Sequence, residues 1–254
     1  MRDKNPITLT LILSHQGRGS SSWINIMKYR AVIFDLFGTL VYNTSPKESE
    51  DNLAQMASVL AIAASDMIQL WTETYCDRQI GVYKSYQENI KHICRLLNSP
   101  ADPEQIERAA AIRRDMLKRE LFMVREDALE VISHIKEKGI KSGLITNCPA
   151  DTETLWKDTP LAPLIDVPVF SSAEGIMKPD ARIYQVTVGR LAVSPQKCIY
   201  IADGGIDGEL KTAGDMRMLP ILIDAYCGEE QISNLEKWQG TTIESIREVL
   251  MLLD

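Results

Sequence analysis

The chain has 254 residues, 45% of them hydrophobic and 25% charged, which is usual for a globular protein with a sizeable core. Its formal net charge of −7 shows no basic excess, so the composition predicts no nucleic-acid partner. No apolar run approaches the length of a membrane span, and we expect no membrane association. The five scattered cysteines have neither zinc-site spacing nor the pattern of a disulfide framework, which favours reduced thiols and a cytoplasmic location.

The beginning of the chain does not look like part of a folded core. A short apolar run, Ile7–Ser14, is followed by a loop-like stretch rich in glycine and serine. Met27 stands immediately before the first apolar strand. We therefore expect residues 1–28 to be an N-terminal extension that is disordered or not native, with Met27 as an alternative start.

The rest of the chain is organised around a short apolar strand that ends in an acidic residue. Ala31–Phe34 run into Asp35, and the turn residues Gly38 and Thr39 follow. Such a run is typical of a strand buried on both faces of a parallel sheet, where ligands bind beyond the carboxyl ends. A buried carboxylate is costly unless it is paired or binds a metal. Asp35 is therefore a candidate nucleophile or metal ligand, the alternative being an aspartate that caps a tight turn.

Residues 44–121 have helical periodicity, and no strand pattern interrupts them. We expect helices over Ser49–Leu60, Met67–Trp71 and Asn89–Leu97, and a fourth that Pro103 opens. Arg78 lies between two of these helices, in a polar stretch with Tyr83, Lys84 and Tyr86. Its guanidinium could bind a carboxylate or phosphate of a substrate through two hydrogen bonds, the alternative being an exposed arginine without such a role.

After this block the chain alternates between helices and strands. Helices are expected at Arg125–Lys138, Ala181–Leu191 and Ile243–Leu253, and strands at Ser142–Thr146, Val167–Ser171, Lys197–Ala202 and Leu219–Ile223. Two prolines make Trp156–Leu164 a loop or a broken helix. The alternation predicts an α/β fold with a doubly wound parallel sheet.

Four stretches, in this order, resemble the motifs of the haloacid dehalogenase-like (HAD-like) hydrolase superfamily. They are Asp35-Leu-Phe-Gly-Thr39 after its strand, Leu144–Asn147, Lys178-Pro179 and Ile199–Gly205. The resemblance implies a Rossmannoid core formed by residues 29–43 and 122–254. It also implies that residues 44–121 are an inserted helical cap of the C1 type, which closes over the site and excludes water.

The resemblance also implies roles for individual residues. Asp35 would be the nucleophile that forms a covalent intermediate. Thr146 and Asn147 match the motif that binds substrate oxygens, and Lys178 would neutralise the charges of Asp35 and the substrate. Together with Phe37, these four residues are the catalytic candidates. The substrate-binding candidates are Gly38, Thr39 and Arg78.

Phe37 and Asp203 favour different chemistries. Phosphatases of the superfamily usually have a second aspartate, a general acid, where this chain has Phe37, and phenylalanine cannot transfer a proton. An aromatic residue there resembles haloacid dehalogenases, whose halide leaving group needs no proton. Asp203, in contrast, matches the acid that helps phosphatases bind Mg²⁺, an ion that prefers oxygen ligands.

The metal site implied by the resemblance contains the side chains of Asp35 and Asp203 and the main-chain carbonyl of Phe37. One more acidic residue is expected a few positions after Asp203. We favour Asp207 for this role over Glu209. The alternative for Glu209 is that it is a solvated residue in the first turn of a helix and binds no metal.

The sequence thus predicts a hydrolase with an aspartate nucleophile and an anionic small-molecule substrate. The first hypothesis is Mg²⁺-dependent, phosphatase-type hydrolysis of a small phosphorylated molecule. A metal-independent 2-haloacid dehalogenase is the second, and a catalytically weak member retained for binding is the third. Neither the natural substrate nor the oligomeric state follows from the sequence.

Overall fold

The computed structural model describes residues 28–206, 208–224 and 238–253. Six parallel strands form one sheet in the order β3-β2-β1-β4-β5-β6. The strands are β1 (Ala31–Phe34), β2 (Lys141–Thr146), β3 (Val167–Phe170), β4 (Cys198–Ala202), β5 (Leu219–Ile223) and β6 (Thr241–Ile243). The order reverses between β1 and β4, as in a doubly wound sheet, so the predicted fold class is confirmed. The predicted N-terminal extension lies, except for Lys28, outside the described residues.

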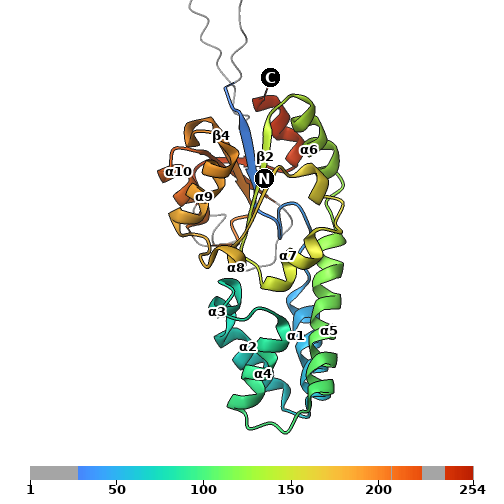
Figure 1. Cartoon of the computed structure of the whole chain (residues 1–254). Coiled ribbons are helices and arrows are strands. Elements are labelled where there is room, and N and C mark those ends of the chain that lie inside the picture. Colours follow the sequence, from blue (N-terminus) through green and yellow to red (C-terminus); the bar gives the residue numbers. More distant parts are fainter. Residues whose placement is uncertain (1–27, 207, 225–237, 254) are drawn as a thin grey trace, which may run out of the picture.

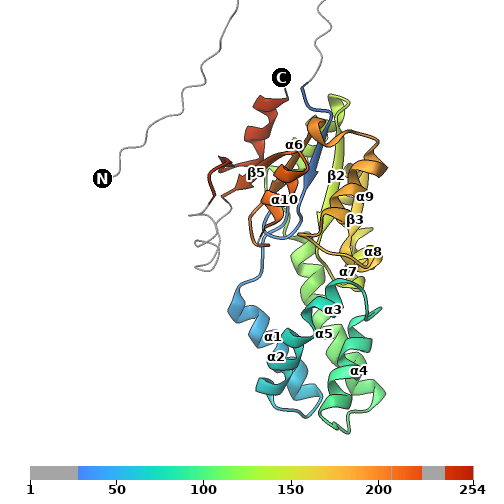
Figure 2. The same ribbon diagram turned by 90° about the vertical axis from the view of Figure 1, so that its left-hand side faces the viewer.

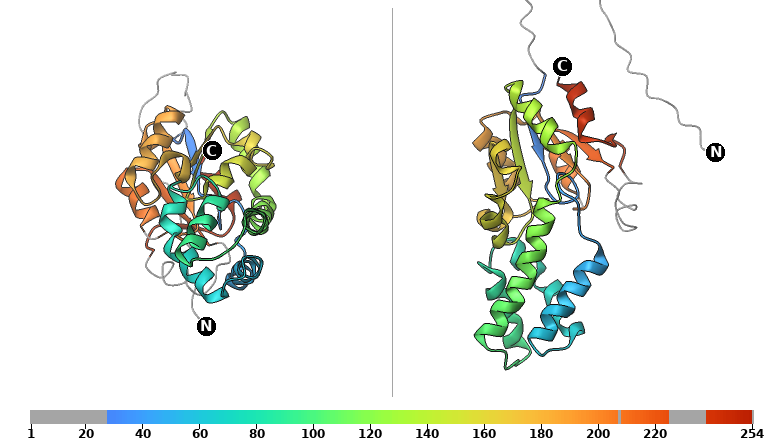
Figure 3. Two further views of the ribbon diagram at one scale, coloured as in Figure 1. Left: turned by 60° about the horizontal axis from the view of Figure 1, so that its bottom comes forward. Right: turned by 90° about the vertical axis from the view of Figure 1, so that its right-hand side faces the viewer.

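Helices cover both faces of the sheet, because alternate side chains of each strand point to opposite sides. Val32 and Phe34 pack on the side of α6 (Ala128–Glu137) and the 3₁₀ helix η3 (Ile246–Leu252). Ala31 and Ile33 pack on the other side, against residues of α9 (Ala181–Leu191) and α10 (Glu209–Asp215). The right-hand view of Figure 3 shows the sheet between these two layers. With apolar groups on both faces, every position of β1 is buried.

A block of five helices is inserted between β1 and β2, at the end of the molecule beyond the carboxyl ends of the strands (Figures 1 and 2). Its helices are α1 (Pro46–Val59), α2 (Ala64–Glu73), α3 (Tyr75–Gln79), α4 (Tyr86–Leu96) and α5 (Pro103–Phe122). Ser45 and Asp102 cap α1 and α5, each in a reciprocal hydrogen-bond pair with the side chain three residues later. A proline at the first helical position follows both caps, so these two starts are encoded locally.

Several contacts connect the helical block to the sheet domain, and one is the hydrogen bond from the Tyr86 amide to Oδ2 of Asp151. Where the chain enters and leaves the block, Val41 pairs with Val124 in an isolated bridge, and the Tyr42 amide donates to the Met123 carbonyl. Near α8 (Ser171–Glu174), the Ser171 hydroxyl donates to the Gln79 carbonyl. These contacts hold the block over the carboxyl end of the sheet.

Three segments differ from the sequence-based expectations. Residues 124 and 125 are extended because their backbone pairs with the chain near Leu40, so α6 begins at Ala128. Residues 150–156 form α7 (Ala150–Trp156), although no helix was expected before Trp156. Of the expected C-terminal helix, Ile243 belongs to β6, which pairs with β5, and residues 246–252 form the 3₁₀ helix η3, whose start is capped by Ser245.

The remaining short elements are the 3₁₀ turns η1 (Ala162–Leu164) and η2 (Pro195–Lys197). In the described part of the chain, no single helix is both long and apolar enough to cross a membrane. Within the same described residues, α1 and α2 taken together are long and apolar enough, but the chain bends by 115° between them.

Candidate active site

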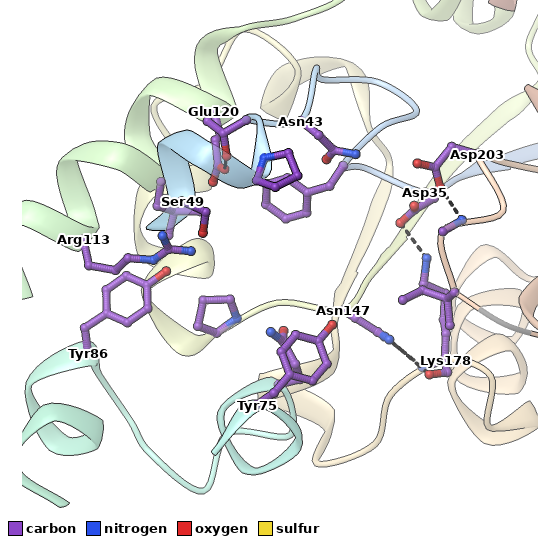
Figure 4. Close-up of a pocket in the computed structure, with 18 residues that line it drawn as sticks. Asp35, Asn43, Ser49, Tyr75, Tyr86, Arg113, Glu120, Asn147, Lys178 and Asp203 are labelled. Atoms are coloured by element: carbon purple, nitrogen blue, oxygen red, sulfur yellow. Dashed lines mark hydrogen bonds and ion pairs between the residues drawn. The ribbon is translucent and has the colours of Figure 1, made fainter. Parts of the chain in front are cut away.

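A cavity of about 1060 Å³ lies between the carboxyl edge of the sheet and the helical block (Figure 4). Parallel sheets bind ligands at this edge, where the strand order reverses. The sheet domain contributes the lining residues Asp35, Phe37, Asn147, Lys178 and Asp203. The helical block contributes Ser49, Tyr75, Tyr86, Arg113 and Glu120. We call these two sets the core wall and the block wall. Five of the residues singled out in the sequence therefore share one wall.

A buried lysine ties the core wall together. The Nζ atom of Lys178 lies 2.6 Å from Oδ1 of Asp35 and 2.8 Å from Oε2 of Glu209. The hydroxyl of Tyr200 also donates to Oε2 of Glu209, at 2.8 Å. Burial alone would lower the pKa of Lys178, but the charges of the two carboxylates outweigh it and hold that pKa above its ordinary value. Lys178 therefore stays charged beside Asp35.

The pKa of Asp35 lies close to neutral pH in this setting. Burial raises the pKa of Asp35 to about 7; the charge of Lys178 opposes the shift, and those of Glu209 and Asp203 add to it. Three carboxylates around a single ammonium leave a net negative charge. A further cation at the site would therefore favour the ionised form of Asp35.

The donor set of the core wall fits a hard divalent cation. One carboxylate oxygen from each of Asp35, Asp203 and Glu209 lies within 4.8 Å of the others, and all three residues are buried. The turn after Asp35 is shaped around this group, because Gly38 has φ +74° and a Cβ there would lie 1.9 Å from Oδ2 of Asp203. Oxygen ligands alone suit Mg²⁺.

Glu209 is not the solvated helix residue considered from the sequence. Its side chain is fully buried, because Oε2 accepts from Lys178 and Tyr200 while Oε1 accepts from the Ile206 amide. Glu209 thus helps to position Lys178, which in turn pairs with Asp35. Asp207, favoured from the sequence as a metal ligand, lies outside the described residues.

Asn147 connects two loops of the core wall. Its Oδ1 accepts from the Lys178 amide at 2.8 Å, and its Nδ2 donates to the Lys178 carbonyl at 3.0 Å. This pair fixes the backbone that carries the lysine. Thr146 and Thr39 are fully buried beside the site and do not line the cavity. Among the described residues, the Thr39 hydroxyl has no hydrogen-bond partner.

Arg78 lies inside the helical block and does not line this cavity. Its Nη1 donates to the Trp71 carbonyl, to Oγ1 of Thr74 and to Oδ1 of Asn89, and its guanidinium stacks 4.0 Å from the Trp71 ring centre. Arg78 is only 4% exposed, so the alternative of an exposed arginine is wrong, and the predicted substrate-binding residue has no place on the wall of this cavity. Its contacts join α2, α3 and α4, which places its role in holding the block together.

Several residues of the block wall, above all Arg113, had no role predicted from the sequence. A signal was present, because Arg113 interrupts the apolar stripe of Ile106, Ala110 and Leu117 along α5. A charged residue on the buried face of a helix is unusual unless it has a partner. Tyr75 on α3 and Glu120 on α5 carried no comparable signal.

The comparisons with known proteins agree with this architecture. Residues 29–209 match the family of haloacid dehalogenase-like hydrolases. The chain belongs to this family. This HAD-like hydrolase is 26% identical over 200 residues to a glyceraldehyde 3-phosphate phosphatase of Methanopyrus kandleri, covering 76% of this chain and 83% of the archaeal protein.

A second relative is the mouse acyl-CoA dehydrogenase family member 10, 33% identical over 115 residues, or 44% of this chain. The match spans only 10% of that mouse protein. Among solved structures, a HAD-family enzyme of Bacteroides thetaiotaomicron in complex with magnesium and inorganic phosphate has a TM-score of 0.60 at 13% identity. That match covers 80% of this chain and 98% of the other. At this identity the likeness shows the fold alone.

Proposed function

We propose that this HAD-like hydrolase carries out Mg²⁺-dependent, phosphatase-type hydrolysis of a small phosphorylated molecule. The observation that carries the proposal is the cluster of Asp35 and Asp203 carboxylates backed by the buried ammonium of Lys178. The archaeal relative named as a phosphatase, and the Bacteroides structure that contains magnesium and phosphate, support it.

In this proposal Asp35 attacks phosphorus. Its Oδ1 accepts a hydrogen bond from Nζ of Lys178, so in this proposal the other oxygen, Oδ2, attacks. The new O–P bond forms as the bond from phosphorus to the leaving oxygen breaks, giving an aspartyl-phosphate that a water molecule then cleaves. Lys178 neutralises negative charge at Asp35 and on the phosphoryl group. Mg²⁺ held by Asp35, Asp203, the Phe37 carbonyl and Asp207 would supply further charge neutralisation on the transferring group.

Phe37 limits which phosphate esters would react well. It lines the cavity where a general acid would be needed, and loss of such an acid typically costs on the order of 10²–10⁴-fold in rate. We therefore expect phosphate esters with good leaving groups to be preferred over simple alkyl phosphates. The same residue favours the second candidate, a metal-independent dehalogenase, in which Asp35 would displace halide from carbon.

We also propose that α1 to α5 act as the cap of this enzyme, with the boundaries expected from the sequence: residues 44–121 for the cap, and 29–43 and 122–254 for the core. The block wall of the cavity supports this role, since a cap that closes over the core wall would exclude water from it.

The decisive experiment is hydrolysis of p-nitrophenyl phosphate with Mg²⁺ and with EDTA, using the wild type and the Asp35→Asn variant. We expect turnover that needs the metal and falls by about 10⁴-fold or more in the variant, because the nucleophile is lost. Asp215→Asn is the matched control, since Asp215 pairs with Lys211 on the exposed surface of α10.

Turnover that persists in EDTA would contradict the metal requirement. Absence of turnover in the wild type, with metal-free release of halide from a 2-haloacid, would favour the dehalogenase. No activity in either assay would favour the third hypothesis, a catalytically weak member of the family that is retained for binding.

A further inference from the structure

We propose that the Arg113 end of the cavity binds a second anionic group of the substrate. The enzyme would then select phosphorylated molecules that also carry a carboxylate or a second phosphate. This inference rests on the proposed function, because it assigns the far half of the same cavity.

The guanidinium of Arg113 has few hydrogen-bond partners for its position, and its Cζ lies 5.4 Å from the centre of the Trp71 ring. Nη1 lies 3.5 Å from Oδ1 of Asn52 and 3.0 Å from the sulfur of Met116. Nε is buried and has no hydrogen-bond partner, and no carboxylate within residues 28–206, 208–224 and 238–253 forms an ion pair with Arg113. Among the described residues the two N–H groups of Nη2 make no hydrogen bond, so they are left for a ligand.

Three other arginines differ from Arg113 in having stronger partners. The buried Nε of Arg125 also has no hydrogen-bond partner, but it lies 3.9 Å from Oδ1 of Asp127. The next residue, Arg114, pairs with Glu107 at the surface. Arg78 is more deeply buried than Arg113, and three oxygen acceptors satisfy its Nη1 atom. Arg113 is half-buried. A charge partly removed from water without a counter-charge is costly, and an incoming anion would lower that cost at Arg113.

The neighbours of Arg113 suit an anion. Figure 4 shows Arg113, Ser49 and Tyr86 together on the block wall, across the cavity from Asp35 and Lys178. Burial raises the pKa of Tyr86 to about 12, so its hydroxyl remains a donor at neutral pH. A guanidinium with two hydroxyl groups matches the oxygens of a carboxylate or phosphate.

Glu120 limits where this anion can lie. It lines the same wall, and its carboxylate accepts a hydrogen bond from the Thr44 hydroxyl. Like charges repel, so the anion is confined to the end of the wall occupied by Arg113. A substrate with one negative group at each end of the cavity satisfies both walls.

The test is equilibrium binding of non-hydrolysable phosphonates to the Mg²⁺-loaded enzyme by calorimetry. Phosphonopropionate, propylphosphonate and propylene bisphosphonate share a chain but differ at the remote end, and longer and shorter homologues of each set cover the unknown span. We expect a ligand with a remote anion to bind roughly tenfold tighter or more than its neutral partner, as a charged hydrogen-bonded pair implies. Whether the carboxylate or the bisphosphonate ligand binds more tightly shows whether the remote group of the substrate is a carboxylate or a second phosphate.

Variants of α5 assign the preference to one residue. Arg113→Met should abolish the preference, and Arg113→Lys, which keeps the charge, should retain part of it. Arg108→Met is the matched control on the same helix, since Arg108 is exposed and does not line the cavity, and it should leave the preference intact.

Equal binding within every matched set, a preference that survives in Arg113→Met, or no phosphonate binding at all would each overturn this proposal. Because the probes are not hydrolysed, these outcomes are separate from a failure of phosphatase turnover.

Discussion

The two walls of the cavity are built on opposite principles. On the core wall, Lys178 pairs with Asp35 and with the fully buried Glu209. On the block wall, Arg113 is left with weak partners and no counter-charge among the described residues. A preorganised network favours a fixed chemical step, whereas unsatisfied donors favour recognition of a group supplied from outside. The contrast supports our proposals that the chemistry takes place in the sheet domain and that the helical block selects the substrate.

The largest expected effect comes from removing the centre of the core wall. Lys178→Met leaves Asp35 and Glu209 buried without their cation, and loss of one partner of a buried ion pair typically costs about 3–5 kcal/mol. Urea denaturation should show this loss in the free energy of unfolding. Lys211→Met is the control: its ion pair with Asp215 is exposed, and such pairs contribute about 0–1 kcal/mol. Similar losses in the two variants would show that the network is not the stabilising feature we infer.

The next effect depends on pH, because the pKa of Asp35 is raised to about 7 from 3.8. Between these values the metal-free folded protein binds more protons than the unfolded chain. Its free energy of unfolding should therefore fall as the pH rises through this window, by up to about 4 kcal/mol. Asp35→Asn should remove that part of the slope when denaturation is measured in EDTA at pH 5 and pH 8. Parallel pH profiles of the two proteins would contradict the assignment.

A smaller effect is expected from alanine substitutions at two glycines, which separate the cost of backbone strain from the cost of changing the shape of the site. Gly38 and Gly139 both have positive φ, at +74° and +71°, so an alanine at either should cost about 1 kcal/mol in stability. Only at Gly38 does the new Cβ collide with Asp203; around Gly139 there is nothing within 4 Å. Gly38→Ala should therefore also lower turnover, by about 10²-fold, because small displacements of reacting groups are costly. Equal turnover of the two variants would remove Gly38 from the site.

Much of the sheet could be predicted from local sequence, since β1 and β4 are short apolar runs followed by an aspartate, and β2 has an apolar pair before Thr146. The residues after these strands converge because the carboxyl ends of parallel strands share one edge. Asp35, Asn147 and Asp203 reach the cavity in this way. Proximity at that edge follows from topology alone and needs no knowledge of packing.

The remaining features depend on contacts between distant parts of the chain. Glu209 looks like any acidic residue in a first helical turn until Lys178 and Tyr200 are placed beside it. β6 pairs with β5 at the edge of the sheet, and three residues show too little periodicity to identify a strand. Arg78 and Arg113 differ in role only because α2, α3 and α4 surround the first, while the second lies at the cavity. Sequence patterns do not encode such differences.

The position of the helical block has a consequence for the order of folding. Ala31 pairs with Lys141 across the sheet, and the whole block lies between them along the chain. Closing so long a loop is entropically costly while the intervening chain is unfolded, and local helix contacts form faster than distant strand pairs. The central strand should therefore gain its neighbour β2 only after the inserted helices have shortened the gap. In pulse-labelling hydrogen exchange during refolding, amides of α1 and α5 would become protected before those of β1.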